Sequence, residues 1–177
     1  MLQFIKQLHK VKFGEHDILI YPDIYALRRT YSQFCKKRLE ENEAVMILPY
    51  YDTVDGVAHF LKELEVDVAK YRKEGSLVII DGLKEFFYSE SSFLSHLAVI
   101  ESHIKAAGKN GISVIVDMGL FYHGHSEELL KYETSMPVNT DFTCKSLLCC
   151  YDTRDFDTLS HAQQELIVGV HKLKLKV

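Results

Sequence analysis

The sequence predicts an α/β fold, a three-layer sandwich built on a mainly parallel sheet. Short segments that are apolar on both faces alternate with segments of helical periodicity along the whole chain. The length of 177 residues and a hydrophobic content of 47% fit one globular domain, which we expect to span residues 1–177. No composition break, low-complexity stretch or internal repeat divides the chain.

The expected strands are short apolar runs that end at turn residues. They cover residues 18–21, 44–50, 77–80, 112–116 and 146–151. Residues 172–177 alternate Lys with apolar side chains, which is typical of a half-exposed edge strand. Because the other strands are apolar on both faces and helices join them, right-handed crossovers should place helices on both sides of the sheet.

The expected helices follow from apolar residues spaced three and four apart. They cover about residues 24–42, 54–64, 67–73, 91–108, 127–136 and 160–170. In the first of them, Leu27, Tyr31 and Phe34 share one face. Thr53 or Asp52 can cap the second helix, and Pro137 ends the fifth.

Charge and composition limit the class of protein. A net charge of −4 argues against a dedicated nucleic-acid binder, which usually carries a basic surplus. No apolar run approaches the roughly 18 residues of a membrane-spanning helix, and the first residues do not resemble a signal peptide. We therefore expect a cytoplasmic protein with no direct contact to membrane or nucleic acid. The four cysteines are expected to be reduced thiols that pack as small hydrophobes; they are Cys35, Cys144, Cys149 and Cys150.

The carboxyl ends of the strands are where such a sheet binds ligands. Aromatic and acidic residues gather there. The expected ligand contacts are Tyr21, Tyr50, Asp117, Met118, Tyr122 and Tyr151, with His16 close to the first strand. Because no Lys or Arg stands at these ends, the lining suits a small, weakly polar organic ligand better than a phosphate. The alternatives are that the acids only cap helices, that the aromatic residues only pack beneath the loops, and that His16 is a buried hydrogen-bonding histidine.

Motifs for phosphate, hydrolysis and metal binding are absent or weak. The chain's one Gly-Lys pair, Gly108-Lys109, is followed by Asn110 and precedes a strand, so it is not a P-loop. Residues 78–81 resemble a Walker B strand without its partner loop. His123 and His125, with Asp117 nearby, could ligate a metal, but histidines in a loop are more often solvated. We expect no catalytic residue, no cofactor and no metal.

Five segments of the chain carry an ordered set of short motifs. They are His16–Tyr21 (H-x-x-x-x-Y), residues 43–48 after the Asn42-Glu43 turn, Ile112 through Asp117-Met118, Leu129–Glu133 (L-L-x-Y-E), and Leu148–Asp152 with Phe156. Together these segments resemble the MEDS domain, the sensory domain of methanogens and methylotrophs. They occur in the family's order over nearly the whole chain. The chain departs from the family in having Gly119-Leu120 where many members have Trp, and His171-Lys172 in place of His-Pro.

The resemblance implies a RecA/KaiC-type core that lacks the P-loop. It further implies a non-catalytic sensory domain that binds a small organic ligand and signals through a partner protein. Two other functions stay open: an interaction or oligomerisation module derived from such a core, including a homo-oligomer, and a residual nucleotide-binding or metal-dependent enzyme. Neither the ligand nor the partner can be carried over from the resemblance.

Overall fold

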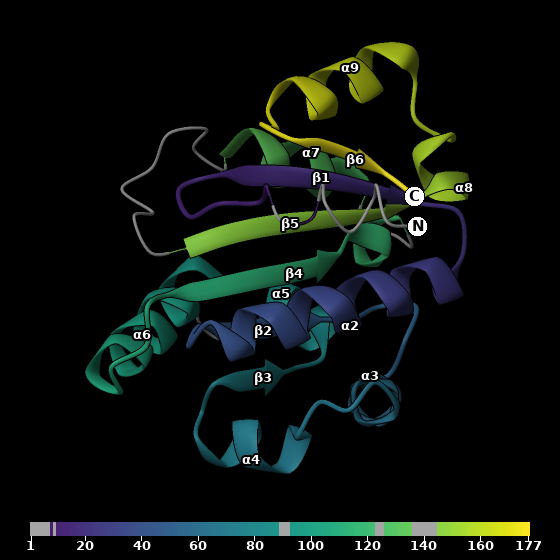
Figure 1. Cartoon of the computed structure of the whole chain (residues 1–177). Coiled ribbons are helices and arrows are strands. Elements are labelled where there is room, and N and C mark those ends of the chain that lie inside the picture. Colours follow the sequence, from purple (N-terminus) through teal and green to yellow (C-terminus); the bar gives the residue numbers. More distant parts are fainter. Residues whose placement is uncertain (1–7, 9, 89–92, 123–125, 136–144) are drawn as a thin grey trace.

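A computed structural model describes residues 8, 10–88, 93–122, 126–135 and 145–177. Within these residues, six strands form one sheet in the order β3-β2-β4-β5-β1-β6, and every neighbouring pair is parallel. The strands are β1 (His16–Tyr21), β2 (Ala44–Leu48), β3 (Leu77–Ile79), β4 (Ile112–Asp117), β5 (Lys145–Asp152) and β6 (Lys174–Lys176). The α/β fold and its parallel sheet are therefore confirmed (Figure 1).

The described helices all lie between β1 and β6 along the chain. They are α2 (Ile24–Glu40), α3 (Val54–Glu63), α4 (Val68–Lys73), α5 (Gly82–Phe87), α6 (Phe93–Ala106), α7 (Ser126–Ser135), α8 (Thr153–Phe156) and α9 (His161–Gly169), with a 3-10 turn η1 (Met118–Phe121) directly after β4. The first helix ends at Glu40, before its expected limit, because Asn42 adopts a left-handed φ of 61°. The short helices α5 and α8 were not expected from periodicity, since neither contains two full turns.

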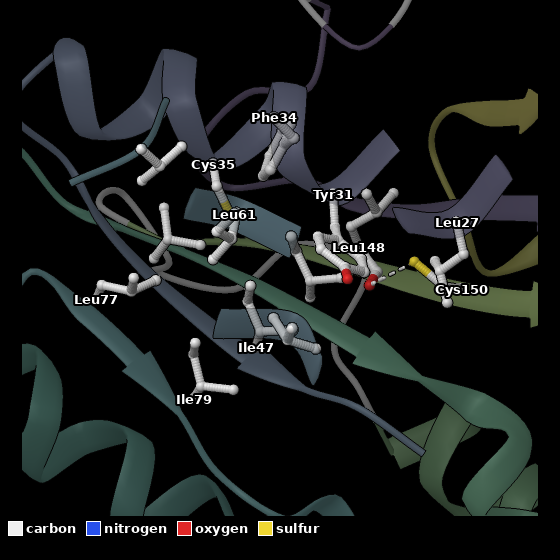
Figure 2. Close-up of a cluster of buried hydrophobic side chains, with 14 of the residues drawn as sticks. Leu27, Tyr31, Phe34, Cys35, Ile47, Leu61, Leu77, Ile79, Leu148 and Cys150 are labelled. Atoms are coloured by element: carbon white, nitrogen blue, oxygen red, sulfur yellow. Dashed lines mark hydrogen bonds between the residues drawn. The ribbon is translucent and has the colours of Figure 1, made fainter. Parts of the chain in front are cut away.

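Two apolar clusters cover the two faces of the sheet. On one face, α2, α3 and α4 pack on inward side chains of the strands; Figure 2 shows this cluster, which includes Leu27, Phe34, Leu61, Ile47 and Leu148. On the other face, α5, α6, α7 and α9 pack on the alternate residues of the same strands, including Ile18, Met46, Val114, Cys149 and Tyr151. Successive side chains of a strand point to opposite faces, so each strand contributes to both clusters.

One edge strand of the sheet was predicted from the sequence, and the other was not. β6 lies at the edge beside β1, as its alternating Lys pattern predicted, and only Leu175 of this strand is buried. β3 forms the opposite edge, with β2, β4 and β5 between it and β1. The segment 78–81 that resembles a Walker B strand therefore lies far from the β1–α2 turn, and Asp81 accepts a hydrogen bond from Lys84 N as the N-cap of α5.

Candidate functional site

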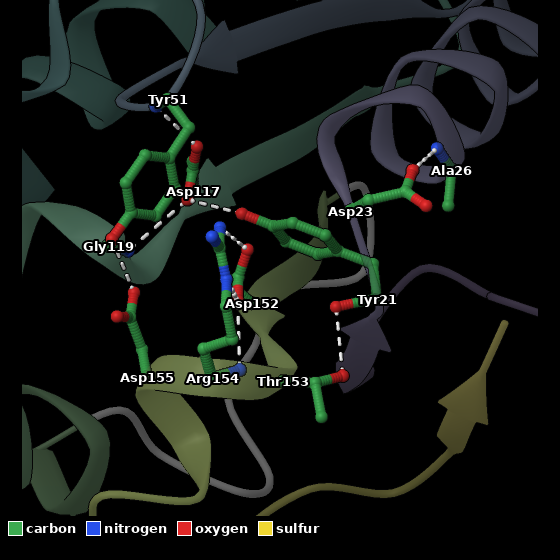
Figure 3. A network of polar contacts seen from close by, with 10 residues as sticks. All are labelled: Tyr21, Asp23, Ala26, Tyr51, Asp117, Gly119, Asp152, Thr153, Arg154 and Asp155. Atoms are coloured by element: carbon green, nitrogen blue, oxygen red, sulfur yellow. Dashed lines mark hydrogen bonds and ion pairs between the residues drawn. The ribbon is translucent and has the colours of Figure 1, made fainter.

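The carboxyl ends of the central strands carry a polar network centred on Asp117 (Figure 3). Asp117 ends β4 and is buried. Its Oδ2 accepts hydrogen bonds from the backbone amides of Tyr50 at 3.2 Å and Tyr51 at 2.9 Å. Its Oδ1 accepts from the Tyr21 hydroxyl and from Gly119 N, both at 3.2 Å. One carboxylate therefore ties β1 and the loop after β2 to the end of β4.

Two opposing effects act on the charge of Asp117. Burial raises its pKa to about 6, and the four donors pull the pKa in the opposite direction because they stabilise the carboxylate. The pKa of Asp117 therefore lies near neutral pH, although its hydrogen bonds favour the ionised form. Loss of a donor from the loop would raise the pKa of Asp117 further, because that donor stabilises the carboxylate.

The turn between β1 and α2 is the first strand-to-helix turn of the described chain, and a P-loop also stands between a strand and a helix. The Asp23 side chain lies there and accepts a hydrogen bond from Ala26 N at 2.9 Å, as the N-cap of α2. The first turn of a helix favours an anion, and in this chain that anion is the carboxylate of Asp23 itself. A bound phosphate would have to displace it.

An open cavity lies at the carboxyl ends of β2 and β3. Its volume is about 400 Å³, and it is lined by Pro49, Tyr50, Asp52, Thr53, Val54, Asp55, Asp81 and Leu83. Three of these residues are acidic and none is Lys or Arg. Asp52 is already neutralised in part, since Arg28 donates to both of its oxygens at 2.9 and 3.1 Å and the Tyr31 hydroxyl donates at 3.1 Å. The remaining charge favours a neutral or cationic ligand over an anion.

The expectation that no Arg stands at a strand end is wrong for β5. Arg154 follows that strand by two residues, and its guanidinium donates to both oxygens of Asp152, at 2.9 and 2.7 Å. The same contacts lower the pKa of Asp152 below its ordinary value. Because this ion pair is complete within the β5–α8 turn, and Arg154 is not among the described residues that line the cavity beside β2 and β3, it adds no positive charge to that lining.

A second polar cluster lies on the opposite face of the sheet, beneath α7 and α9. It contains His16 of β1, Glu133 of α7, Cys149 of β5 and His171, which precedes β6. His16 Nε2 lies 3.1 Å from Cys149 Sγ and 3.5 Å from Glu133 Oε2, and His171 Nε2 lies 3.4 Å from Glu133 Oε2. All four side chains are buried, and one ligand atom from each lies within 4.8 Å of the others.

Burial sets the protonation of this second cluster. It lowers the pKa of His16 to about 3 and that of His171 to about 4, so both imidazoles are neutral at ordinary pH. It raises the pKa of Glu133 to about 7 and that of the Cys149 thiol well above its usual range. The Tyr151 hydroxyl donates a hydrogen bond to Glu133 Oε1. Within the described part of the chain, Glu133 Oε2 and His171 Nε2 have no hydrogen-bond partner.

The seven residues expected to contact a ligand are divided between these places. Tyr21 and Asp117 are hydrogen-bonded to each other on the α2 face, and Tyr50 lines the cavity beside them. His16 and Tyr151 both contact Glu133 on the other face. Met118 and Tyr122 pack in the apolar cluster of that same face. Tyr151 pairs with Ile20 in the register of β1 and β5, so it faces away from Tyr21, the next residue along β1.

A family model matches residues 15–172, and its description is MEDS, the methanogen/methylotroph, DcmR sensory domain. The chain belongs to the MEDS family. This match confirms the resemblance that the strand and helix motifs predicted.

Solved structures similar to this MEDS domain share its fold at low sequence identity. A KaiC-like protein from Pyrococcus horikoshii is 16% identical with a TM-score of 0.62, over 93% of this chain and 72% of that chain. The flagellar accessory protein FlaH from Methanocaldococcus jannaschii is 11% identical with a TM-score of 0.64, over 98% and 76%. An uncharacterized P. horikoshii protein in complex with an unknown peptide is 14% identical with a TM-score of 0.65, over 99% and 82%.

These likenesses confirm a KaiC-like core for the MEDS domain. No curated protein matches the chain. Among the described residues, no helix has both the length and the apolar character needed to cross a membrane.

Sequence reasoning did not predict that Glu133 and His171 belong to this buried cluster of the MEDS domain, and it treated Cys149 as a small hydrophobe. Each stands in or near a family-like motif, but positions 16, 133, 149 and 171 are too far apart in the chain to suggest a common site. The loop pair of His123 and His125, the metal-binding alternative considered above, lies outside the described residues, as does Cys144.

Proposed function

We propose that this MEDS domain is a non-catalytic sensor that binds a small organic ligand at the carboxyl ends of β2 and β3 and signals through a partner protein. The observation that carries the proposal is the double role of the loop after β2. Tyr50 of this loop lines the cavity, and the amides of Tyr50 and Tyr51 both donate to the buried Asp117. A ligand that moves this loop changes the hydrogen bonds of the central strands.

The route of the signal follows the same contacts. Asp117 also accepts from Tyr21 of β1, and the Tyr51 hydroxyl donates to Asp155 of α8 at 2.7 Å. The loop therefore contacts the end of β4 and helix α8 directly, and it is linked to β1 through Asp117. Rearrangement of these few hydrogen bonds on ligand binding alters the surface formed by the strand ends, which is the surface that we assign to the partner.

The acidic lining supports a ligand that carries an amine or a hydroxyl group. Asp55 is exposed in the first turn of α3 and lines the cavity, and Leu83 contributes an apolar wall. Charge pairing with an amine and contact with an apolar wall together suit a short alkylamine. An inorganic phosphate meets carboxylates on the same walls, and Asp23 already occupies the α2 N-terminus.

Thermal unfolding of the purified chain with methylamine, methanol, acetate and inorganic phosphate tests the proposal. A ligand at one hundred times its Kd stabilises the folded state by about 2.7 kcal/mol, so methylamine or methanol should raise the Tm. The substitution Asp55→Asn should reduce that rise, and Asp157→Asn, an exposed aspartate outside the cavity lining, should leave it unchanged. A flat response to all four compounds would remove the support for a sensor of this ligand class.

A second function, an interaction module, draws support from the position of β6. This strand pairs with β1 on one side and ends the sheet on the other, so its outer backbone groups can pair with another chain. Size-exclusion chromatography with light scattering distinguishes the two functions. An oligomer that no ligand stabilises would favour the module over the sensor.

A further inference from the structure

The buried cluster beneath α7 and α9 has the composition and geometry of a metal centre. Its four side chains come from parts of the chain that are distant in sequence. Successive side chains of a strand point to opposite faces of the sheet, and this alternation places the two strand residues of the cluster on the same face. Cys149 and Tyr151 are two residues apart on β5 and face the same side, and His16 begins the neighbouring strand β1. We propose that His16, Glu133, Cys149 and His171 form a four-coordinate site for a divalent transition-metal ion of the zinc type.

Two distances between ligand atoms agree with the edges of a coordination tetrahedron, a third is slightly shorter, and all four atoms lie within 4.8 Å of one another. Zinc–nitrogen and zinc–oxygen bonds of about 2.0–2.1 Å give tetrahedral edges of about 3.3–3.4 Å. Glu133 Oε2 lies 3.5 Å from His16 Nε2 and 3.4 Å from His171 Nε2. Cys149 Sγ lies 3.1 Å from His16 Nε2, so a bond to sulfur of about 2.3 Å requires only a small outward movement of the thiol.

The proton on His171 lies on the side away from the centre. Its Nδ1 is 2.6 Å from the carbonyl oxygen of Ile167. A carbonyl can only accept, so Nδ1 carries the proton and the lone pair of Nε2 points toward Glu133. A histidine that ligates a metal almost always donates its other N–H to such an acceptor, which fixes the ring and raises its basicity.

Glu133 has a similar outer contact. The Tyr151 hydroxyl donates to Oε1, which leaves Oε2 directed at the two imidazoles. Without an ion, Oε2 and His171 Nε2 are buried polar atoms with no hydrogen-bond partner among the described residues. Natural proteins rarely leave such atoms unsatisfied, and a metal ion between them would satisfy both.

The donor set identifies the class of ion. Two imidazole nitrogens, one thiolate and one carboxylate are the ligands that zinc accepts, and the sulfur disfavours magnesium and calcium. The thiol and the carboxyl each release one proton to solvent on binding, so the two negative charges balance the ion. Since all four ligands are buried, no coordination position is open to solvent, which is typical of a structural site.

A metal here would join β1, α7, β5 and the connection from α9 to β6. The site lies on the opposite face of the sheet from the α2 cluster that contains Tyr21, and none of its ligands lines the proposed ligand cavity. Its role is therefore to hold the C-terminal segment against the sheet. The inference stands whether or not the domain is a sensor.

Metal analysis of the full chain, purified without a histidine tag or chelator, tests the site. Mass spectrometry of the metals should find about one equivalent of zinc per chain. Protein unfolded with a chelator and refolded with Co²⁺ should develop the ligand-field bands of tetrahedral cobalt and a thiolate-to-cobalt charge-transfer band. Less than about a tenth of an equivalent of any transition metal, with no cobalt band after refolding, would overturn the proposal.

The two adjacent cysteines provide a matched pair of variants. Cys149→Ala should lose the charge-transfer band and most of the zinc, and Cys150→Ala, equally buried on the opposite face, should keep both. Tyr151→Phe keeps the ring and removes the contact to Glu133, which should weaken zinc binding by about 10–100-fold. Equal loss of zinc in both cysteine variants would contradict the ligand assignment. If Cys149→Ala does not fold, the zinc content and cobalt spectrum of the unsubstituted chain decide the question.

Discussion

The Tyr21 hydroxyl donates a hydrogen bond to Asp117 Oδ1 at 3.2 Å, although β5 separates their strands β1 and β4 in the sheet. The side chain of Tyr21 therefore spans the end of the intervening strand. Together with the two loop amides that donate to Oδ2, this contact makes Asp117 the point where three strand ends meet. The same carboxylate is the element of the proposed sensor that substitution can test most directly.

Replacing Asp117 with Asn should destabilise the fold. The amide nitrogen of Asn cannot accept, so at least one of the four donors now bonded to Asp117 loses its partner in a buried place. Each such loss costs about 1–3 kcal/mol. Urea denaturation of Asp117→Asn beside the exposed control Asp157→Asn measures the difference. A cost for Asp117→Asn no larger than that for the control would mean that the network is not stabilising.

The cost of Asp117→Asn should depend on pH. The folded-state pKa of Asp117 is raised to about 6, above the unfolded value of 3.8, so the folded protein binds more protons between these pH values. The contribution of Asp117 to the free energy of unfolding of the unsubstituted chain therefore decreases as the pH rises from about 4 to 6. The Asn variant has no titrating group at this position, so its free energy of unfolding shows no such decrease. Denaturation at a series of pH values should give a larger cost near pH 4 than near pH 7. The reverse trend would show that the four donors, rather than burial, dominate the pKa of Asp117.

Gly119→Ala should disturb the loop after β2. A Cβ at this position would meet Tyr51 Cε2 at 2.5 Å and Tyr50 Cδ1 at 2.8 Å, so the two rings would have to move. Overpacking of this kind costs about 1–3 kcal/mol. In the control Gly169→Ala the new Cβ has no neighbour within 4 Å, and the helix α9 should gain slightly from the better helix former. Thermal unfolding of both variants gives the comparison, and equal Tm values would contradict the close contact.

The chain should not hydrolyse ATP, and ATP with magnesium should not raise its Tm. The physical reason is the β1–α2 turn, where Pro22 removes one backbone donor and the Asp23 carboxylate occupies the helix N-terminus. A phosphate-release assay and thermal unfolding check the two statements. Turnover that disappears in Asp117→Asn or Asp81→Asn would establish the enzyme alternative instead.

The α/β class and the two-sided strands could be predicted from the sequence because buried parallel strands leave uninterrupted apolar runs. The edge position of β6 was also predictable, because a strand with Lys at every second position cannot be buried on both faces. The order of the strands was not predictable, because no local pattern reports which strands pair. The place of β3 at the far edge, which removes residues 78–81 from the β1 turn, follows only from that order.

The site could be predicted only in part, for a related reason. Strand ends carrying Tyr and Asp indicated the end of the sheet at which the structure places Asp117 and the Tyr50 loop. Which face each side chain takes depends on register, and register separates Tyr21 from Tyr151. The convergence of His16, Glu133, Cys149 and His171 depends on α7 and α9 packing beside each other over β1 and β5, which no spacing in the sequence expresses.

An NMR titration of the ¹⁵N-labelled chain with methylamine tests the sensor most directly, because it reports on the loop amides themselves. The amide resonances of Tyr50, Tyr51 and Gly119, all hydrogen-bonded to Asp117, should shift together along one saturable curve, and the shifts should shrink in Asp55→Asn. Saturable shifts confined to other parts of the chain, or no shift at any of the three amides, would contradict ligand sensing through the Asp117 network.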